Sequence, residues 1–350
     1  MDRGAIGMHM HIRGCAKLRE AGFPAVALNA GGAGMAQITI TDRGALDPTE
    51  AIAFLEAQGH EVTLLDTLDP AELLAKTPNC EGIVASFIEL DADTLRALPQ
   101  LKVIATTSVG FNKIDVAVAR ELGIDVCNMP SVASEEVATH AVAGMLSMLR
   151  ELRASYEQVE GGEWDYSALP LPPRASELTL GLLSFGRIAR KVAHRALPFF
   201  DKVIAYDPFV PEDAWEEGVE RVHSTDELLE RSNVISLHAL LTDETRDFLN
   251  RETIAKLPRG AYVINVARGE LIDSDALLDA LASGQVRSAF LDVLQVEPAA
   301  ADDPFVAHPN VQVTPHSAFR SDATLREYFM VPAENVTLVL RGEKPHTLVN

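Results

Sequence analysis

Short apolar runs alternate with longer amphipathic stretches along most of this chain, starting near residue 36. Runs with the composition of buried strands occupy 37–41, 62–65, 82–85, 103–106 and 126–128. Stretches with apolar residues at helical spacing lie at 48–58, 92–98 and 116–121. This order predicts an α/β fold with a parallel sheet covered by helices on both faces.

A second series of strands and helices runs from Leu178 to about Pro315. The segment from Glu135 to Leu152 joins the two series, and its helical spacing continues for about five turns, long enough to bridge two lobes. We therefore predict two Rossmann-like, doubly wound lobes with an active-site cleft between them. The predicted parts are a loose N-terminal extension at 1–35, a flavodoxin-like lobe at 36–132 and 318–350, and a second lobe at 133–317.

The composition limits the partners of the protein. Thirty Lys and Arg against 51 Asp and Glu give a formal net charge of −21, which repels phosphate backbones and anionic lipid headgroups. No apolar run approaches the roughly 18 residues of a membrane helix. The cysteines Cys15, Cys80 and Cys127 lack CxxC spacing, as is typical of a reducing compartment. We expect a cytoplasmic protein without nucleic-acid or membrane partners.

Two pairs of residues have spacings that admit a metal ion. His9 and His11 alternate near the amino end, where a loose tail is the favoured interpretation. Glu136 and His140 lie four apart on the predicted long helix, but no third candidate ligand is near them in the sequence. A helix-face contact is therefore favoured there, and we predict no metal site.

A strand–turn–helix–strand unit at 178–207 opens the second series, with its helix expected from Arg190. Gly186 lets the backbone approach a pyrophosphate, and the helix N-terminus offers it free N–H groups. Asp207 ends the second strand, where an acid accepts hydrogen bonds from the adenosine ribose and repels a 2′-phosphate; this predicts NAD rather than NADP. Ser184 occupies the first glycine position of the fingerprint, where we expect a positive φ. The alternative interpretation is a helix-capping turn in an unrelated parallel sheet.

Three polar residues follow apolar strands further along the chain: Arg268, Glu297 and His316. Ligands of open parallel sheets bind at the carboxyl ends of strands, so we expect the three to converge on one cleft. The set suits a 2-keto acid. Arg268 would clamp a carboxylate and polarise the adjacent carbonyl. His316 would exchange the proton of the substrate oxygen, and Glu297 would stabilise its protonated form.

Motifs spread over residues 36–342 resemble the D-2-hydroxyacid dehydrogenase family, and within it the branch similar to C-terminal-binding-protein dehydrogenases. These motifs lie at 106–115, 126–136, 237–245, 265–269, 291–293 and 314–316. The resemblance implies an NAD-dependent oxidoreductase acting on the CH–OH group of 2-hydroxy acids, with Arg268, Glu297 and His316 as the catalytic set. It also implies that lobe 133–317 binds NAD and that the other lobe binds substrate.

The resemblance further implies individual contacts. Val109 and Gly110 would offer backbone N–H groups to the substrate carboxylate, and Asp292 would hold the nicotinamide carboxamide. The predicted cofactor-binding residues are Ser184, Phe185, Gly186, Arg187, Ile188, Asp207, His238, Thr245, Val266, Ala267, Arg268, Asp292 and His316, and the predicted substrate-binding residues are Phe87, Val109, Gly110, Arg268 and His316.

The chain departs from the family pattern at several positions. Ser184 replaces the first fingerprint glycine, Leu240 stands where the family usually has proline, and residues 1–35 have no counterpart. Glu297 stands where a formate dehydrogenase would have glutamine, which argues against that subclass.

The loop 85–93 contains three acids and no base. We expect it to repel a phosphorylated substrate, which predicts a small unphosphorylated 2-keto acid such as glyoxylate, hydroxypyruvate or pyruvate, with Phe87 and Ile88 bounding the side-chain pocket.

The arm 156–173 has more apolar residues than a solvated loop needs, which predicts a homodimer. The alternative function is an NAD-sensing, corepressor-like interaction protein, against which the net charge of −21 argues.

Overall fold

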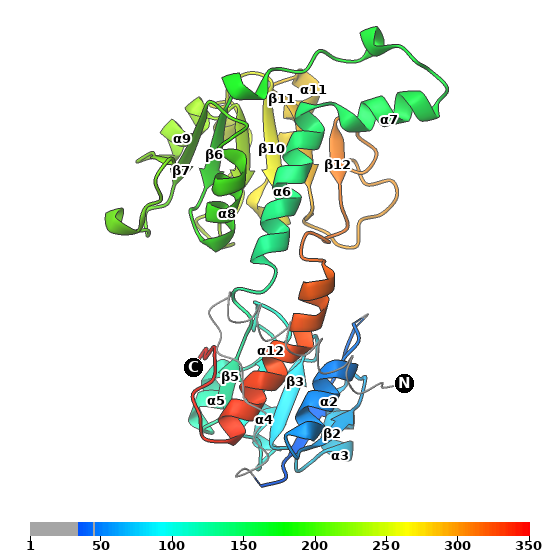
Figure 1. The fold of residues 1–350 in the computed structure, drawn as a ribbon, viewed down its shortest axis with the longest axis vertical. Coiled ribbons are helices and arrows are strands. Elements are labelled where there is room, and N and C mark those ends of the chain that lie inside the picture. The colour runs from blue at the N-terminus through cyan, green and yellow to red at the C-terminus, as the bar shows by residue number, and fades with distance from the viewer. Residues whose placement is uncertain (1–33, 45) are drawn as a thin grey trace, which may run out of the picture. The chain divides into compact units, whose positions relative to one another are not determined.

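The computed structural model describes residues 34–44 and 46–350 (Figure 1). Contacts divide the chain into two compact units. Unit 1 comprises the chain up to Val132 together with Ser321–Asn350, and unit 2 comprises Ala133–Arg320. Each unit is built on one parallel β-sheet, so the predicted fold class is confirmed.

Unit 1 has a five-stranded sheet in the order β2-β1-β3-β4-β5, all strands parallel. This is the flavodoxin-like order that we expected. Its strands are β1 (Gln37–Ile40), β2 (Glu61–Leu64), β3 (Gly82–Ala85), β4 (Val103–Thr106) and β5 (Asp125–Cys127). Its helices are α2 (Thr49–Ala57), α3 (Pro70–Lys76), α4 (Ala92–Arg96), α5 (Val116–Glu121) and α12 (Asp322–Leu340).

Helices cover both faces of this sheet. Helices α2 and α12 pack on one face, where Phe54 and Phe329 join a core with Ile38. Helices α3, α4 and α5 pack on the other, where Leu95 and Ile104 lie in a second core. The strands are buried on both sides, which explains their nearly continuous apolar sequences.

Unit 2 has a seven-stranded parallel sheet in the order β12-β11-β10-β9-β6-β7-β8. Its strands are β6 (Thr179–Leu183), β7 (Lys202–Tyr206), β8 (Glu220–Arg221), β9 (Val234–Leu237), β10 (Ala261–Asn265), β11 (Val286–Leu291) and β12 (Val311–Val313). Its helices are α6 (Ser134–Leu149), α7 (Leu152–Glu160), α8 (Arg187–Ala196), α9 (Thr225–Arg231), α10 (Arg251–Ile254) and α11 (Ser274–Ser283). Short 3₁₀ turns occupy Tyr166–Ala168, Ala175–Glu177, Glu212–Ala214 and Gly269–Leu271. The strand order is that of a dinucleotide-binding sheet, reversing at β6, with β12 added at one edge.

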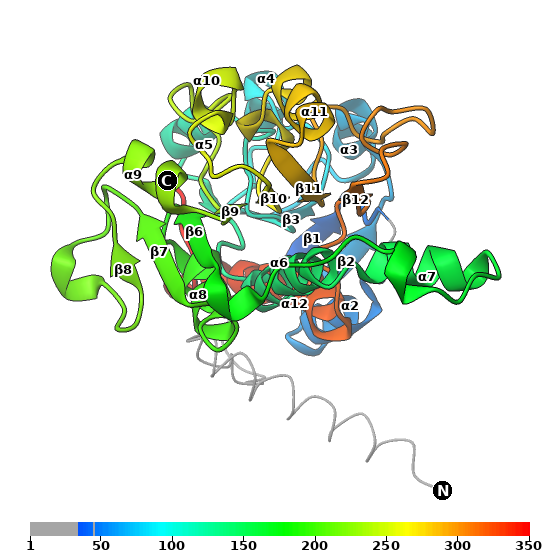
Figure 2. The same ribbon diagram turned by 90° about the horizontal axis from the view of Figure 1, so that it is seen from above.

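The sheet of unit 2 also lies between two helical layers (Figure 2). Helices α6 and α8 share one core with its first face, and α9, α10 and α11 share another with its second face. Helix α6 approaches β11 closely at Gly144, where an added Cβ would overlap the ring of Phe290.

Two helix boundaries differ by three residues from the sequence prediction, and one helix was not predicted. The long helix ends at Leu149 rather than Leu152, because Glu151 has a left-handed backbone (φ 51°) and a separate helix, α7, starts after it. Helix α8 starts at Arg187, immediately after the glycine turn, and not at Arg190. Helix α3 was not predicted; Asp69 caps its N-terminus by accepting from the N–H of Ala71, with Pro70 as its first residue.

The described residues bear on two further predictions, which concern the cysteines and membrane-spanning helices. Cys80 and Cys127 are buried and unpaired, and burial raises their thiol pKa to about 11 and about 12 respectively. Cys15, His9 and His11 lie outside the described residues. Among the helices that the structure describes, none combines the length and apolarity needed to cross a bilayer.

Candidate active site

Most of the predicted site residues follow strands of unit 2. Because all seven strands are parallel, their carboxyl ends lie along one edge of the sheet. Gly186 follows β6, Asp207 follows β7, His238 follows β9, Arg268 follows β10, Asp292 follows β11 and His316 follows β12. The topology therefore brings residues that are up to about 130 positions apart in the chain to one edge.

The turn between β6 and α8 fits a pyrophosphate. An added Cβ at Gly186 would meet no atom within 4 Å, so space is open over the turn. Gly186 also precedes α8 without a side-chain cap, which leaves the helix N-terminus for an anion. Ser184 has φ 73°, as expected. The side chain of Phe185 is buried and stacks on Trp215 with ring centroids 4.5 Å apart, so the backbone of Phe185 faces the turn.

Asp207 is buried and its carboxylate organises this turn. Oδ2 accepts from the Ser184 hydroxyl (3.0 Å) and the Phe185 N–H (2.8 Å), and Oδ1 accepts from the Phe209 N–H (2.9 Å). Burial by itself would raise the pKa of Asp207, but these hydrogen bonds outweigh it and hold the pKa below its usual value. The group is therefore an anion at neutral pH.

His238 and Thr245 follow β9. Desolvation lowers the pKa of His238 to about 4, although part of the residue reaches the surface, so its imidazole is neutral at pH 7. Its Nε2 lies 2.9 Å from the hydroxyl of Ser236. The Thr245 hydroxyl donates to the carbonyl of Leu240 (2.6 Å) and accepts from the N–H of Thr242 (2.8 Å). It thus fastens the loop that departs from the family pattern at Leu240.

Glu297 and His316 are brought into direct contact. Nδ1 of His316 lies 2.7 Å from Oε2 of Glu297, and the other carboxylate oxygen accepts from the N–H of Leu294 (2.9 Å). With Nδ1 on the carboxylate, Nε2 is the ring nitrogen left for a substrate oxygen. Both side chains line a pocket of about 540 Å³ together with Asp292, Leu294, Pro298, Ala299, Val306, Val313, Thr314 and Pro315.

Asp292 holds the backbone of the segment that carries His316. Its nearly inaccessible carboxylate accepts from the Thr314 hydroxyl (2.5 Å), the Ser317 N–H (2.9 Å) and the Ala318 N–H (3.0 Å), and its carbonyl accepts from the His316 N–H (2.9 Å). His316 is held with φ 48°. Burial would raise the pKa of Asp292, but hydrogen bonds, including one from His140, lower it below its usual value.

His140 was missed as a site residue by the sequence analysis. Its Nε2 lies 3.0 Å from the hydroxyl of Thr314 and 3.4 Å from Asp292, and its ring packs 5.3 Å from that of Phe290. Because Thr314 donates its own proton to Asp292, Nε2 of His140 is the donor toward Thr314. These contacts join α6 to β11 and to the ends of β11 and β12, and the predicted helix-face contact with Glu136 stays a prediction.

Arg268 lies at the same edge but makes no side-chain contact with Glu297 or His316 among the described residues. Its Nη1 donates to the carbonyl of Ala267 (2.6 Å), and Asn265 fastens the loop by donating to the Arg268 carbonyl (2.7 Å). Val266 is buried, and Ala267 donates its N–H to the Asn265 side chain (3.0 Å). The Arg268 guanidinium is exposed and available to an anion.

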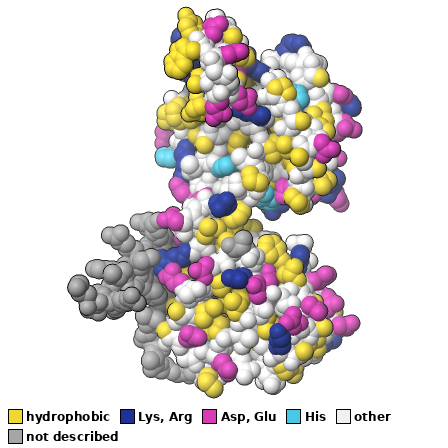
Figure 3. All heavy atoms as spheres, turned by 90° about the vertical axis from the view of Figure 1, so that its right-hand side faces the viewer, with side chains coloured by type: hydrophobic (Ala, Val, Ile, Leu, Met, Phe, Trp, Pro, Cys, Tyr) yellow, Lys and Arg dark blue, Asp and Glu magenta, His cyan; other side chains and the backbone are white. Residues whose placement is uncertain are grey.

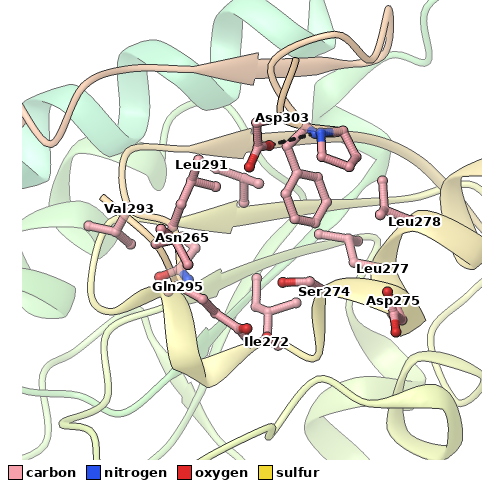
Figure 4. A pocket seen from close by; sticks show the side chains of 15 residues that line it. Asn265, Ile272, Ser274, Asp275, Leu277, Leu278, Leu291, Val293, Gln295 and Asp303 are labelled. Atoms are coloured by element: carbon pink, nitrogen blue, oxygen red, sulfur yellow. Dashed lines mark hydrogen bonds between the residues drawn. The ribbon is translucent and has the colours of Figure 1, made fainter. Parts of the chain in front are cut away.

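The loop with Arg268 touches the loop with Glu297. A Cβ on Gly269 would overlap the backbone of Leu294, so the two chains meet backbone to backbone there. Behind this contact lies a pocket of about 170 Å³, around which Figure 4 shows Leu277, Leu278 and Ile272. The amide of Gln295 at its wall is already used, donating to the Ile272 carbonyl (2.7 Å).

In unit 1, the turn 108–110 has the features of an anion site. The carbonyls of Ser108, Val109 and Gly110 all accept hydrogen bonds, from Met129, Asn128 and Ser108 respectively. Within the part of the chain that the structure describes, the N–H groups of Val109 and Gly110 have no acceptor. They are therefore available to a carboxylate.

The loop that follows β3 agrees only partly with its prediction. Phe87 is exposed, but the prediction that Ile88 bounds a pocket is wrong: its side chain is buried in the core under β3. Exposed and buried residues alternate along 87–91, so neighbouring side chains point to opposite sides of the loop. Sequence reasoning also missed Lys113, whose ammonium donates to the Phe87 carbonyl (2.8 Å) and brings a base to this loop. Asp42 holds the loop by accepting from the Phe87 N–H (2.9 Å).

Comparison with known proteins identifies the family. The model for "D-isomer specific 2-hydroxyacid dehydrogenase, NAD binding domain" matches residues 142–318. A hydroxypyruvate reductase of Thermotoga maritima is 38% identical over 288 residues, which cover 81% of this chain and 92% of that protein. The chain belongs to the D-isomer specific 2-hydroxyacid dehydrogenase family. This family comprises NAD-dependent oxidoreductases, and the cofactor of unit 2 is NAD.

Other relatives show how wide the family is. A glyoxylate reductase of Korarchaeum cryptofilum is 35% identical, covering 79% of this chain and 85% of that protein. A D-3-phosphoglycerate dehydrogenase of Methanocaldococcus jannaschii is 37% identical over 90% of this chain, but the chain spans only 60% of the length of that relative. Among solved structures, D-lactate dehydrogenase with NAD⁺ from Lactobacillus jensenii has a TM-score of 0.80 at 26% identity, covering 90% of this chain and 99% of that one. The narrower resemblance to C-terminal-binding-protein dehydrogenases stays a prediction.

Proposed function

We propose that this protein interconverts a small 2-keto acid and the corresponding D-2-hydroxy acid with NAD as the redox partner. The observation that carries the proposal is the His316–Glu297 hydrogen bond of 2.7 Å, at the sheet edge that also holds the nucleotide turn. A histidine oriented by a carboxylate is the arrangement needed for general acid–base work on a substrate oxygen.

Each residue then has a separate task. Bound NADH supplies the hydride for reduction. His316 gives a proton from Nε2 to the substrate oxygen while Glu297 holds Nδ1. Arg268 binds the carboxylate and polarises the neighbouring carbonyl with its planar donor group. Asp292 and His140 keep the segment of His316 in place, and the N-terminus of α8 binds the pyrophosphate.

Glyoxylate, hydroxypyruvate and pyruvate are the substrates that we propose. Support comes from the exposed acids Glu89, Asp91 and Asp93, which follow Phe87 in the sequence and disfavour a dianion. Lys113 favours a phosphorylated substrate, because its positively charged ammonium contacts the same loop. The balance between these charges decides whether a phosphorylated acid is accepted.

The test is a panel of 2-keto acids with NADH, followed at the nicotinamide absorbance, for the native protein and a Lys113→Met variant. We expect kcat/KM to be higher for hydroxypyruvate than for 3-phosphohydroxypyruvate in both proteins, with the phosphorylated acid weakened further in the variant. Preference for 3-phosphohydroxypyruvate in the native protein, lost in Lys113→Met, would show that the proposed substrate class is wrong.

We also propose a homodimer formed through the arm 156–173 of unit 2. Tyr156 lies on α7, and the following segment continues away from the sheet before it returns toward β6 (Figure 1). Trp164, Tyr166 and Leu171 are each about nine-tenths exposed. Figure 3, which faces the side of α7, shows hydrophobic side chains exposed beside acidic ones on this unit. Apolar side chains gathered in this way are suited to burial against a second copy.

A further inference from the structure

The hydroxyl of Ser184 lies where a nucleotide hydroxyl is expected to bind. Ser184 Oγ donates to Oδ2 of Asp207 at 3.0 Å. We propose that the Ser184 hydroxyl competes with the adenosine ribose for hydrogen bonds to Asp207. Ser184 would thereby lower the affinity of the protein for NADH. The inference rests on the proposed role of Asp207 as the ribose acceptor.

The Asp207 carboxylate has one spare acceptor position, whereas the adenosine ribose presents two neighbouring hydroxyls. A carboxylate offers about four lone-pair positions. Three are taken by the Ser184 hydroxyl and by the N–H groups of Phe185 and Phe209. The second of the two ribose hydroxyls must therefore replace one of these donors.

Ser184 is the donor that can leave most easily. The Phe185 N–H is fixed by the buried ring of its own residue, which stacks on Trp215. The N–H of Phe209 is part of the loop backbone after β7. The Ser184 hydroxyl, in contrast, moves by rotation of one side-chain bond while the backbone stays in place, held by the hydrogen bond from Ser184 N–H to the Tyr206 carbonyl (2.8 Å).

The same hydroxyl stabilises the turn when no nucleotide is bound. With φ 73°, Ser184 occupies a conformation in which a glycine carries no Cβ penalty. Its hydrogen bond to a buried carboxylate offsets part of that strain. Removing the hydroxyl should therefore lower the stability of the free protein and at the same time raise its affinity for NADH. A residue with a purely structural role would not give these two opposite changes.

The test uses the full chain and NADH, with Kd measured by nicotinamide fluorescence and Tm measured without nucleotide. In Ser184→Ala we expect NADH to bind about 10-fold more tightly, the size expected for one hydrogen bond to a charged group, while Tm falls. Ser184→Gly removes the Cβ as well, so it should keep the gain in affinity and recover Tm relative to Ser184→Ala. Ser224→Ala, which removes a hydroxyl that caps α9 by accepting from the Glu227 N–H, is the matched control: Tm falls and the Kd stays unchanged.

Equal or weaker NADH binding by Ser184→Ala would overturn the inference. Asp207→Asn tests whether Asp207 is the ribose acceptor. If this variant binds NADH as tightly as the native protein, Asp207 is not the acceptor and the inference about Ser184 is wrong. The proposed reaction does not depend on that result, because turnover of 2-keto acids by the native protein tests it directly.

Discussion

Ser184 and His316 are non-glycine residues with left-handed backbones, and both lie at the carboxyl edge of the unit 2 sheet. Each such residue costs on the order of 1–3 kcal/mol and persists only where its surroundings determine it. Asp207 fixes the first through its side chain, and Asp292 fixes the second: its carboxylate accepts from two backbone N–H groups and its carbonyl from that of His316. Two buried carboxylates thus hold the two turns on which the proposed chemistry depends.

The Glu297–His316 pair leads to a prediction about turnover. His316→Ala removes the proposed proton donor, so we expect kcat to fall by roughly two to four orders of magnitude while NADH still binds. Glu297→Gln keeps an oxygen near Nδ1 but removes the charge, and an intermediate fall is expected. Stopped-flow turnover and NADH fluorescence measure the two quantities. Loss of NADH binding in His316→Ala would mean that the residue supports the fold of the site instead.

His238 leads to a prediction about pH. Burial lowers its pKa to about 4 in the folded protein, whereas an unfolded histidine has a pKa near 6.5. As the pH falls from about 6.5 to 4, the unfolded chain binds a proton that the folded protein excludes, so folding stability decreases over this window. The loss is roughly 2–3 kcal/mol, allowing for partial access of solvent to the residue.

The variant His238→Gln lacks this titration. In urea unfolding at several pH values, the native protein should lose stability relative to the variant between pH 6.5 and 4. The exposed residue His223 supplies a matched control, and His223→Gln should follow the native protein. A constant difference between native protein and His238→Gln at every pH would contradict the buried neutral state.

Residue positions at strand ends were predictable, but several of their contacts were not. Arg268, Glu297 and His316 follow apolar strands, and parallel topology alone places them on one edge. His140 and Lys113 are distant in sequence from the groups that they contact, and no local pattern marks such pairs. The role of Ile88 was wrongly predicted because the composition of a loop does not show which side chains turn inward.

At the scale of elements, hydrophobic periodicity predicted the strands and most helices but not every boundary. Apolar residues keep their helical spacing past Glu151, so the sequence pattern did not show the end of α6. The left-handed backbone of Glu151 separates α6 from α7. The first turn of α8 is exposed toward the nucleotide turn and contains polar residues. The hydrophobic pattern therefore did not show that the helix starts at Arg187. Helix α3 is short and has one fully buried residue, Leu73, so its periodic signal is weak.

The contact between the loops after β10 and β11 gives a prediction at this scale. In Gly269→Ala, the new methyl group overlaps the backbone of Leu294, which cannot rotate away as a side chain does. The loops must separate, so we expect a loss of about 1–3 kcal/mol in unfolding free energy and a fall in kcat/KM. Chemical denaturation and steady-state kinetics measure the two effects.

Gly34→Ala is a suitable control, since an added Cβ there meets no atom within 4 Å. It should change neither stability nor kcat/KM appreciably. Native kinetics in Gly269→Ala would show that the positions of Arg268 and Glu297 do not depend on this contact.

At the scale of the whole molecule, unit 2 alone contains the nucleotide turn, the Glu297–His316 pair and Arg268. Unit 1 contains the turn 108–110 with its available N–H groups. The family, the cofactor and the fold class were predicted from the sequence, because the alternation of strands and helices and the motifs at strand ends are local patterns. The substrate depends on a balance of charges around Phe87, which includes a contact from Lys113 that only the fold brings about.

The arm 156–173 gives a prediction about assembly. Stable dimers bury about 1,200–2,000 Å² in total, and large exposed aromatic side chains supply much of that area and energy. Trp164 and Tyr166 are each 90% exposed in the chain by itself. Light scattering at micromolar concentration should therefore give twice the 37.9 kDa mass of one chain.

Charge placed in the arm should prevent this association. We expect Trp164→Glu combined with Tyr166→Glu to give a monomer, because two carboxylates would be desolvated at a two-fold interface and face their own copies. Phe209 is 92% exposed but lies after β7, away from the arm, so Phe209→Glu should remain a dimer and serves as the control. A monomeric native protein, or a double variant that stays dimeric, would show that the exposed apolar groups of the arm have another use.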